Sequence, residues 1–114
     1  MKHLKITIHA EQAKQKELLR VCRMIVDETR QLAGCKECSQ MEEIIDENFI
    51  AIECQWQHRQ QLDDYFRSDR FSVLLGAIKL LGKHYEITID DGSPEEGSTA
   101  VENARARNAE SLSI

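Results

Sequence analysis

Strict alternation of apolar and polar positions marks the first segment of the chain. In residues 3–9 every second side chain is aliphatic, and the side chains between them are polar or charged. A period of two residues predicts a β-strand with one buried face. From about residue 12 the apolar positions change to helical spacing, and Gly34 stands where a helix commonly ends. The start of the chain therefore predicts a strand followed by an amphipathic helix.

The same two periods predict the rest of the domain. Residues 36–45 and 49–56 are predicted strands joined by a turn at 46–48, residues 62–66 and 71–81 are helical, and residues 85–89 form a last strand. Ser68 is a predicted N-cap between the two helical segments. The order predicts an α+β fold of ferredoxin-like βαββαβ type over residues 1–90, with a four-stranded antiparallel sheet. We expect the first and third strands to lie side by side in the middle, parallel to one another.

The composition changes at Asp91. Residues 91–114 contain five acids, two arginines and few large apolar side chains. Little apolar surface is available there to offset the entropy of ordering, so we expect a mobile acidic tail. Thr99 and Glu102 have the spacing of a capping box, which leaves a weak helix over residues 100–112 as the alternative.

One face of the predicted sheet has no helix to cover it. Period-two counting puts Ile6, Ile8, Ile50, Ile52 and Trp56 under the helices, and Lys5, Thr7, His9, Ala51, Glu53 and Gln55 on the other face. Two copies packed sheet against sheet would bury this second face, so we expect a homodimer formed through it. Lys5 and Glu53 are predicted to be neighbours across the sheet.

Composition narrows the class of protein. The net charge is -5, which argues against nucleic acid as a partner, and no apolar run approaches the length of a membrane span. The N-terminus resembles no signal peptide, so we expect a cytoplasmic protein with four reduced cysteines.

Cys35 and Cys38 form a C-x-x-C pair, for which zinc binding, thiol redox chemistry and structural packing are the alternatives. We favour packing because the pair follows a helix and opens a strand, and no second ligand pair has zinc spacing.

Several motifs in order resemble the antibiotic biosynthesis monooxygenase family. They are Gly34-Cys35-Lys36-Glu37-Cys38, Glu53-x-x-Trp56, and the run from Leu62-Asp-Asp-Tyr65-Phe66-Arg67-Ser68 through Phe71 to Leu80. The resemblance covers about residues 2–90. It implies a dimeric α/β barrel built from two ferredoxin-like subunits. The family includes cofactor-free oxygenases acting on phenolic polyketides or quinols, haem-degrading enzymes, and members without known activity.

The resemblance also suggests site residues. It implies that Trp56 lines a cleft between sheet and helices, with a large core residue as the alternative. Tyr65 stands where relatives often carry a histidine; tyrosine titrates near pH ~10, so it is a weak candidate for catalysis. The haem-degrading branch needs a histidine and an asparagine where this chain has Leu75 and Ile6. Neither of these side chains can ligate iron or polarise an oxygen bound to it. We therefore exclude haem degradation.

Two functions remain open. The first is a cofactor-independent monooxygenase that holds a phenolic or quinol substrate in an apolar cleft. The second is a non-catalytic dimeric module that binds a small molecule or stabilises a partner. The substrate-binding candidates are Trp56, Ile6, Ile50, Ile52, Phe66 and Phe71, and His9 joins Tyr65 as a weak catalytic candidate. We expect no cofactor and no metal.

Overall fold

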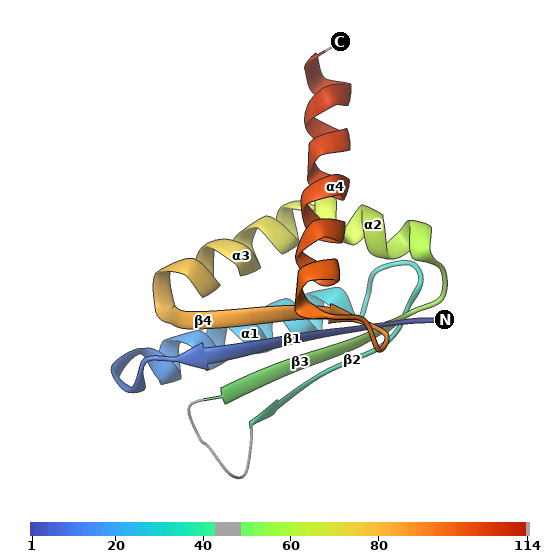
Figure 1. The fold of residues 1–114 in the computed structure, drawn as a ribbon. Helices are drawn as coiled ribbons and strands as arrows, with labels where there is room; N and C mark the ends of the chain where they lie inside the picture. The colour runs from blue at the N-terminus through green and yellow to red at the C-terminus, as the bar shows by residue number, and fades with distance from the viewer. Residues whose placement is uncertain (43–48, 114) are drawn as a thin grey trace.

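A computed structural model describes residues 1–42 and 49–113 of the chain (Figure 1). Its elements are β1 (Lys2–Ala10), the short 3-10 helix η1 (Gln12–Lys14), α1 (Gln15–Thr29), β2 (Cys35–Glu42), β3 (Phe49–Trp56), α2 (Arg59–Arg67), α3 (Asp69–Leu81), β4 (Gly82–Ile89) and α4 (Pro94–Ser113). The elements predicted for residues 1–90 are confirmed. The predicted turn at 46–48 and the end of the predicted second strand lie outside the described residues.

The four strands form one open sheet in the order β2-β3-β1-β4, and every neighbouring pair is antiparallel. The predicted α+β ferredoxin-like class is thus confirmed. The expectation that β1 and β3 run parallel is wrong. The helical crossover through α1 returns β2 parallel to β1, and β3 then pairs antiparallel with β2. Lys5 and Glu53 are nevertheless direct neighbours, as predicted, with their Nζ and Oε1 atoms 3.9 Å apart.

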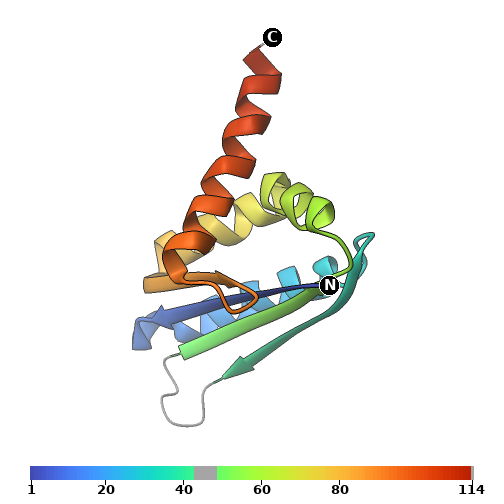
Figure 2. The ribbon, with the colours of Figure 1, turned by 45° about the vertical axis from the view of Figure 1, so that its right-hand side comes forward.

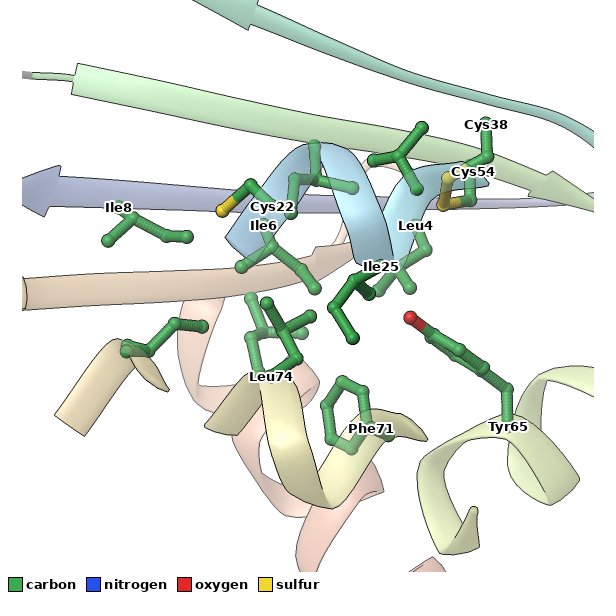
Figure 3. Close-up of a cluster of buried hydrophobic side chains, with 14 of the residues drawn as sticks. Leu4, Ile6, Ile8, Cys22, Ile25, Cys38, Cys54, Tyr65, Phe71 and Leu74 are labelled. Carbon is green, nitrogen blue, oxygen red and sulfur yellow. A yellow bond between two sulfur atoms is a disulfide. The ribbon is translucent and has the colours of Figure 1, made fainter. Parts of the chain in front are cut away.

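The core lies between the sheet and the helices. The inward side chains of β1 and β3 are at most 1% exposed, and α1 and α3 pack over them (Figure 3). In Figure 1, α1 lies behind the strands. Burial alternates along β1, so the outward side chains are only partly covered. The predicted two faces of the sheet are confirmed.

Helix α3 begins where a side chain satisfies one of its free backbone N–H groups. The Ser68 hydroxyl accepts the backbone N–H of Phe71 at 3.2 Å, which confirms Ser68 as the N-cap of α3. Gly82 follows the last residue of α3 as expected. Ser68 also follows the last residue of α2, so it is the point at which α2 ends and α3 begins.

Where we expected a mobile acidic tail or a weak helix over 100–112, the structure has the packed helix α4. The Ser93 hydroxyl accepts the backbone N–H of Glu96 at 3.2 Å and opens the helix ahead of Pro94. Val101 and Ala104 are buried in the core, and α4 packs on β4 and α2. Its C-terminal end projects away from the body of the chain (Figure 2). No described helix is both long and apolar enough to cross a membrane.

The cysteines do not all remain thiols. Cys38 and Cys54 lie opposite each other on β2 and β3 and are joined by a disulfide, so the expectation of four reduced cysteines is wrong for this pair. The expectation used the compartment alone, whereas strand register decides which cysteines meet. Cys35 and Cys22 are free, and burial raises the pKa of Cys22 to about 12. Among the described residues no group of three or more His, Cys, Asp or Glu side chains is placed to hold a metal.

The end of β4 is fastened to the start of β1 by Asp90. Its backbone N–H donates to the carbonyl of His3 at 2.7 Å, and its Oδ1 accepts the backbone N–H of His3 at 2.9 Å. Lys2 Nζ lies 3.3 Å from the other carboxylate oxygen. Asp90 adopts a φ of 54°, a conformation that Asp and Asn tolerate better than most residues. The hydrogen bond from His3, more than the nearby Lys2, holds the pKa of Asp90 below its ordinary value.

We expect Asp90→Asn to flatten the pH dependence of stability on the acid side. Because the folded-state pKa of Asp90 is lowered, its contribution is complete above the ordinary carboxyl pKa of about 4 and is lost as the pH falls through the folded value. Urea unfolding midpoints from pH 6 to about 3 should therefore fall less steeply in Asp90→Asn than in the parent. Asp91→Asn, which removes the same charge one residue later, is the control and should follow the parent.

Candidate functional site

A cavity of about 430 Å³ lies beside the end of β3, which we call the tryptophan cavity. Its lining consists of Leu32, Ala33, Trp56, Gln61, Asp64, Tyr65 and Ser68. The residues from 61 to 68 come from α2 and the corner after it, and residues 32 and 33 follow α1. The volume lies within the range of small-molecule pockets, and the two aromatic rings make it a fitting place for a ring-shaped ligand.

Trp56 contributes an unsatisfied hydrogen-bond donor to this region. The side chain is 1% exposed, and its Nε1–H has no acceptor among the described residues. A buried donor without a partner costs roughly 1–3 kcal/mol, and native structures contain few of them. A ligand oxygen or nitrogen that accepts this N–H would remove that cost. Trp56 therefore combines a side chain that lines the cavity with a buried donor that has no acceptor among the described residues.

Tyr65 packs against Trp56, with ring centroids 4.9 Å apart, and edge-on against Phe71 at 5.3 Å. Its hydroxyl points away from α2 toward Ile25 (Figure 3) and lies 3.3 Å from the Thr29 hydroxyl. Thr29 uses its single proton on the carbonyl of Ile25 at 2.7 Å, so Tyr65 is the donor to Thr29. Burial raises the pKa of Tyr65 to about 12. At neutral pH Tyr65 is therefore a neutral packing residue and no proton acceptor for a phenol.

The polar rim of the cavity comes from α2. Gln61 Oε1 accepts the backbone N–H of His58 at 3.1 Å, which helps to close the start of the helix. Asp64 is more than half exposed, pairs with Arg67, and accepts from Gln60 at 3.1 Å. Among the described residues that line this cavity, Asp64 carries the one charged group, and its carboxylate is paired with the guanidinium of Arg67.

The structure places the other predicted binding residues elsewhere. Ile6, Ile50, Ile52, Phe66 and Phe71 belong to the core, are at most 1% exposed, and are not among the residues that line the tryptophan cavity. Trp56 and Tyr65 are the two predicted site residues that the fold brings together there.

His9, the second weak catalytic candidate, lies on the open face of the sheet. Its ring stacks on Phe49 with centroids 4.6 Å apart. Side chains of successive strand residues alternate between faces, so His9 points away from the helix layer to which Trp56 belongs. His9 and Trp56 therefore lie on opposite faces of the sheet.

Sequence reasoning missed five lining residues, at positions 32, 33, 61, 64 and 68. A signal for three of them was present. Gln61, Asp64 and Ser68 recur at three- and four-residue spacing together with Tyr65, which places them on one face of a helix. The two residues after α1 carry no such signal, because only the packing of the helices brings them to the cavity.

A larger hollow of about 790 Å³ lies at the start of α4, but its chemistry is less specific. It is lined by acids including Asp91, Glu95 and Glu96, which are exposed, and by Arg59, which pairs with Asp63. Exposed carboxylates of this kind are ordinarily hydrated. We therefore regard the tryptophan cavity, with its buried aromatic donor, as the candidate site.

Comparison with known proteins identifies the fold. No family model and no curated protein matches the sequence. Among solved structures, a Deinococcus radiodurans protein provisionally assigned to the antibiotic biosynthesis monooxygenases is similar with a TM-score of 0.76 and 19% identity, over 82% of this chain and 93% of its own. An antibiotic biosynthesis monooxygenase aligns with a TM-score of 0.73 and 19% sequence identity. The alignment covers 82% of this chain and 100% of that protein. A conserved protein of Methanosarcina mazei aligns with a TM-score of 0.73 and 21% sequence identity. The alignment covers 78% of this chain and 89% of that protein.

These likenesses cover nearly the whole of the other proteins and leave part of this chain unmatched. The unmatched share is about the size of α4, which has 20 of the 114 residues. Identities this low establish the arrangement of helices and strands and not the chemistry. The chain has the fold of the antibiotic biosynthesis monooxygenases.

Proposed function

We propose that this protein binds a small aromatic molecule in the tryptophan cavity and acts on it as a cofactor-independent monooxygenase of the antibiotic biosynthesis monooxygenase type. Two observations carry the proposal: Trp56 and Tyr65 line a cavity of about 430 Å³, and the indole N–H of Trp56 is buried without an acceptor among the described residues. The names of the similar structures support the reaction class. The favoured substrate is a phenol or quinol whose oxygen accepts the indole N–H.

In this proposal the substrate supplies the electrons that reduce O₂. The protein binds the ring against Trp56 and Tyr65, orients its oxygen, and keeps bulk water away. Trp56 N–H stabilises negative charge on the substrate oxygen and so favours the ionised, electron-rich form. Tyr65 holds the wall of the site in place through its hydrogen bond to Thr29.

A specific observation favours the alternative, a non-catalytic binding module. Tyr65 cannot act as a base at neutral pH, since its pKa is raised to about 12, and Asp64 is paired with Arg67. A site with a donor and aromatic walls but no free base can hold a ligand without turning it over. In that case the same cavity binds the same class of molecule, and only the reaction is missing.

Oxygen uptake separates the two functions. The protein is incubated in air with a panel of quinols and polycyclic phenols, and O₂ consumption is followed beside ligand binding measured by quenching of Trp56, the single tryptophan. A monooxygenase consumes O₂ in proportion to product, and Trp56→Phe lowers the rate by about tenfold or more through loss of one N–H donor. Binding without O₂ uptake supports the module. Absence of both binding and uptake contradicts the assigned site.

We further propose that the protein works as a homodimer formed through the open face of the sheet. The helices cover the opposite face, and the open face carries Ala51, which is 2% exposed, beside the ion pair of Lys5 and Glu53. The Nε2 atom of His3 lies 4.0 Å from Oε1 of Glu53. A second copy with the same surface would bury this mixed face and continue the packing of the sheet.

Removing one partner of the ion pair tests this arrangement. In the dimer we expect Glu53→Gln to leave Lys5 buried and unpaired, at a cost of about 3–5 kcal/mol to association. Adding Lys5→Met to the same chain should restore part of the loss. Sedimentation velocity over micromolar concentrations measures the dissociation constant for the parent and both variants. A parent that sediments as a monomer at every concentration in this range contradicts the proposed dimer.

A further inference from the structure

A second cavity, of about 340 Å³, is lined by side chains of α3, β4 and α4. We call it the α4 cavity; its lining consists of Leu75, Lys79, Tyr85, Ile87, Ser98, Val101, Glu102 and Arg105. It shares no lining residue with the tryptophan cavity. Its walls from Leu75, Ile87 and Val101 are apolar, and Ile87 and Val101 are buried. An apolar chamber of this size is adequate for a small ligand.

Arg105 places a positive charge at this cavity. The guanidinium is part-buried and donates to two neutral oxygens, the carbonyl of Phe66 at 2.8 Å and the hydroxyl of Ser72 at 2.9 Å. Neither acceptor carries charge, and no described carboxylate forms an ion pair with Arg105. A guanidinium has five N–H donors, so these two bonds leave donors for a third group. The charge is therefore held in position by the fold without being neutralised by it.

The other charged residues of the cavity leave it cationic. Lys79 lies at the exposed rim on α3, and Glu102 is exposed on α4, three residues before Arg105. Two cations and one carboxylate give a net positive rim above an apolar floor. Tyr85 adds a ring and a hydroxyl to the wall. This combination is complementary to a molecule with an apolar body and one anionic end.

We propose that the α4 cavity binds a small amphipathic carboxylate, its hydrocarbon part on Leu75, Ile87 and Val101 and its carboxylate on Arg105 and Lys79. The site depends on α4, because residues 98–105 supply half of its wall. It does not depend on the reaction proposed for the tryptophan cavity. Arg105 also donates to the carbonyl of Phe66, the neighbour of Tyr65, so this side chain connects the α4 cavity with α2.

The test uses octanoate as the probe and octan-1-ol as its uncharged counterpart, with the full chain. Both are titrated by calorimetry, and backbone and indole resonances are followed by NMR. We expect octanoate to bind about tenfold or more tightly than the alcohol, since a charge-assisted hydrogen bond distinguishes them. The amides of Tyr85 and Val101 should shift, while the indole N–H of Trp56, the single tryptophan, should not.

Two variants complete the test. Lys79→Gln changes an exposed rim residue and should weaken octanoate binding several-fold without altering the melting temperature. Val101→Phe fills the chamber and should abolish binding, with circular dichroism confirming that the helices remain. Equal affinity for acid and alcohol, the absence of saturable binding at millimolar octanoate, or shifts confined to the Trp56 indole would each overturn the proposal.

Discussion

Replacing Trp56 with alanine is expected to lower the free energy of unfolding by about 3–5 kcal/mol. The side chain is 1% exposed and packs on Tyr65, so truncation removes a large buried ring and leaves a void beside an existing cavity. Urea unfolding followed by circular dichroism measures the loss, because the variant no longer contains a tryptophan for fluorescence. Ligand binding should fall as well, since the cavity loses its wall.

Trp56→Phe is the matched control for this result. Phenylalanine keeps an aromatic ring in the site and removes the indole N–H that has no acceptor. We expect a smaller loss of stability than in the alanine variant, because no hydrogen bond is broken, together with a clear loss of ligand affinity. An alanine variant that unfolds at the same urea concentration as the parent contradicts the buried position of Trp56 and indicates a residue that contacts ligand alone.

Replacing Gly97 with alanine is expected to destabilise the protein by about 3 kcal/mol and to loosen α4. A Cβ atom at this position would lie 1.9 Å from the carbonyl oxygen of Ile87, a backbone atom of β4 that cannot turn away. The helix must therefore move off the strand, which exposes Val101 and Ala104. Thermal unfolding measures the loss, and hydrogen exchange of the α4 amides shows whether that helix opens first.

Gly76→Ala is the matched comparison, because it makes the same substitution at a position where we expect stability to rise. Gly76 lies in α3, and a Cβ there meets nothing within 4 Å. Alanine should stabilise the helix by up to about 1 kcal/mol, since glycine is the weaker helix former. If both substitutions had the same effect, the close approach of α4 to β4 would be contradicted. Loss of the α4 cavity in Gly97→Ala would also follow, because its wall comes from the same helix.

Much of the fold could be predicted from local patterns. The structure confirms the two-residue alternation in β1 and β3, the helical spacing in α1 and α3, and the Ser68 cap. Each of these patterns depends only on residues that are neighbours in the sequence. The start of α4 was also visible, because Ser93, Pro94 and Glu96 stand at the N-cap, first and third helical positions. We nevertheless favoured a mobile tail, with a helix over residues 100–112 as the alternative, because few large apolar side chains follow. The small Ala104 and Val101 suffice where glycine lets the helix approach the strand.

The candidate site could be predicted only in part. Trp56 and Tyr65 were identified from the sequence, and the structure places their rings in contact at one cavity. We also predicted that five further inward side chains line the cleft, namely those of Ile6, Ile50, Ile52, Phe66 and Phe71. Periodicity shows that a side chain faces inward, but not whether it meets a cavity or another side chain there. These five side chains pack instead into the core.

By itself the sequence determined the types and order of the strands and helices within residues 1–90 and the two faces of the sheet. These follow from periods of two and 3.6 residues and from caps, which act over a few neighbours. Only the tertiary structure decided the antiparallel direction of β1 against β3, the joining of Cys38 to Cys54, and the two cavities. Each of these depends on how segments distant in the chain meet, and packing between them is set by the whole set of contacts and not by any local pattern.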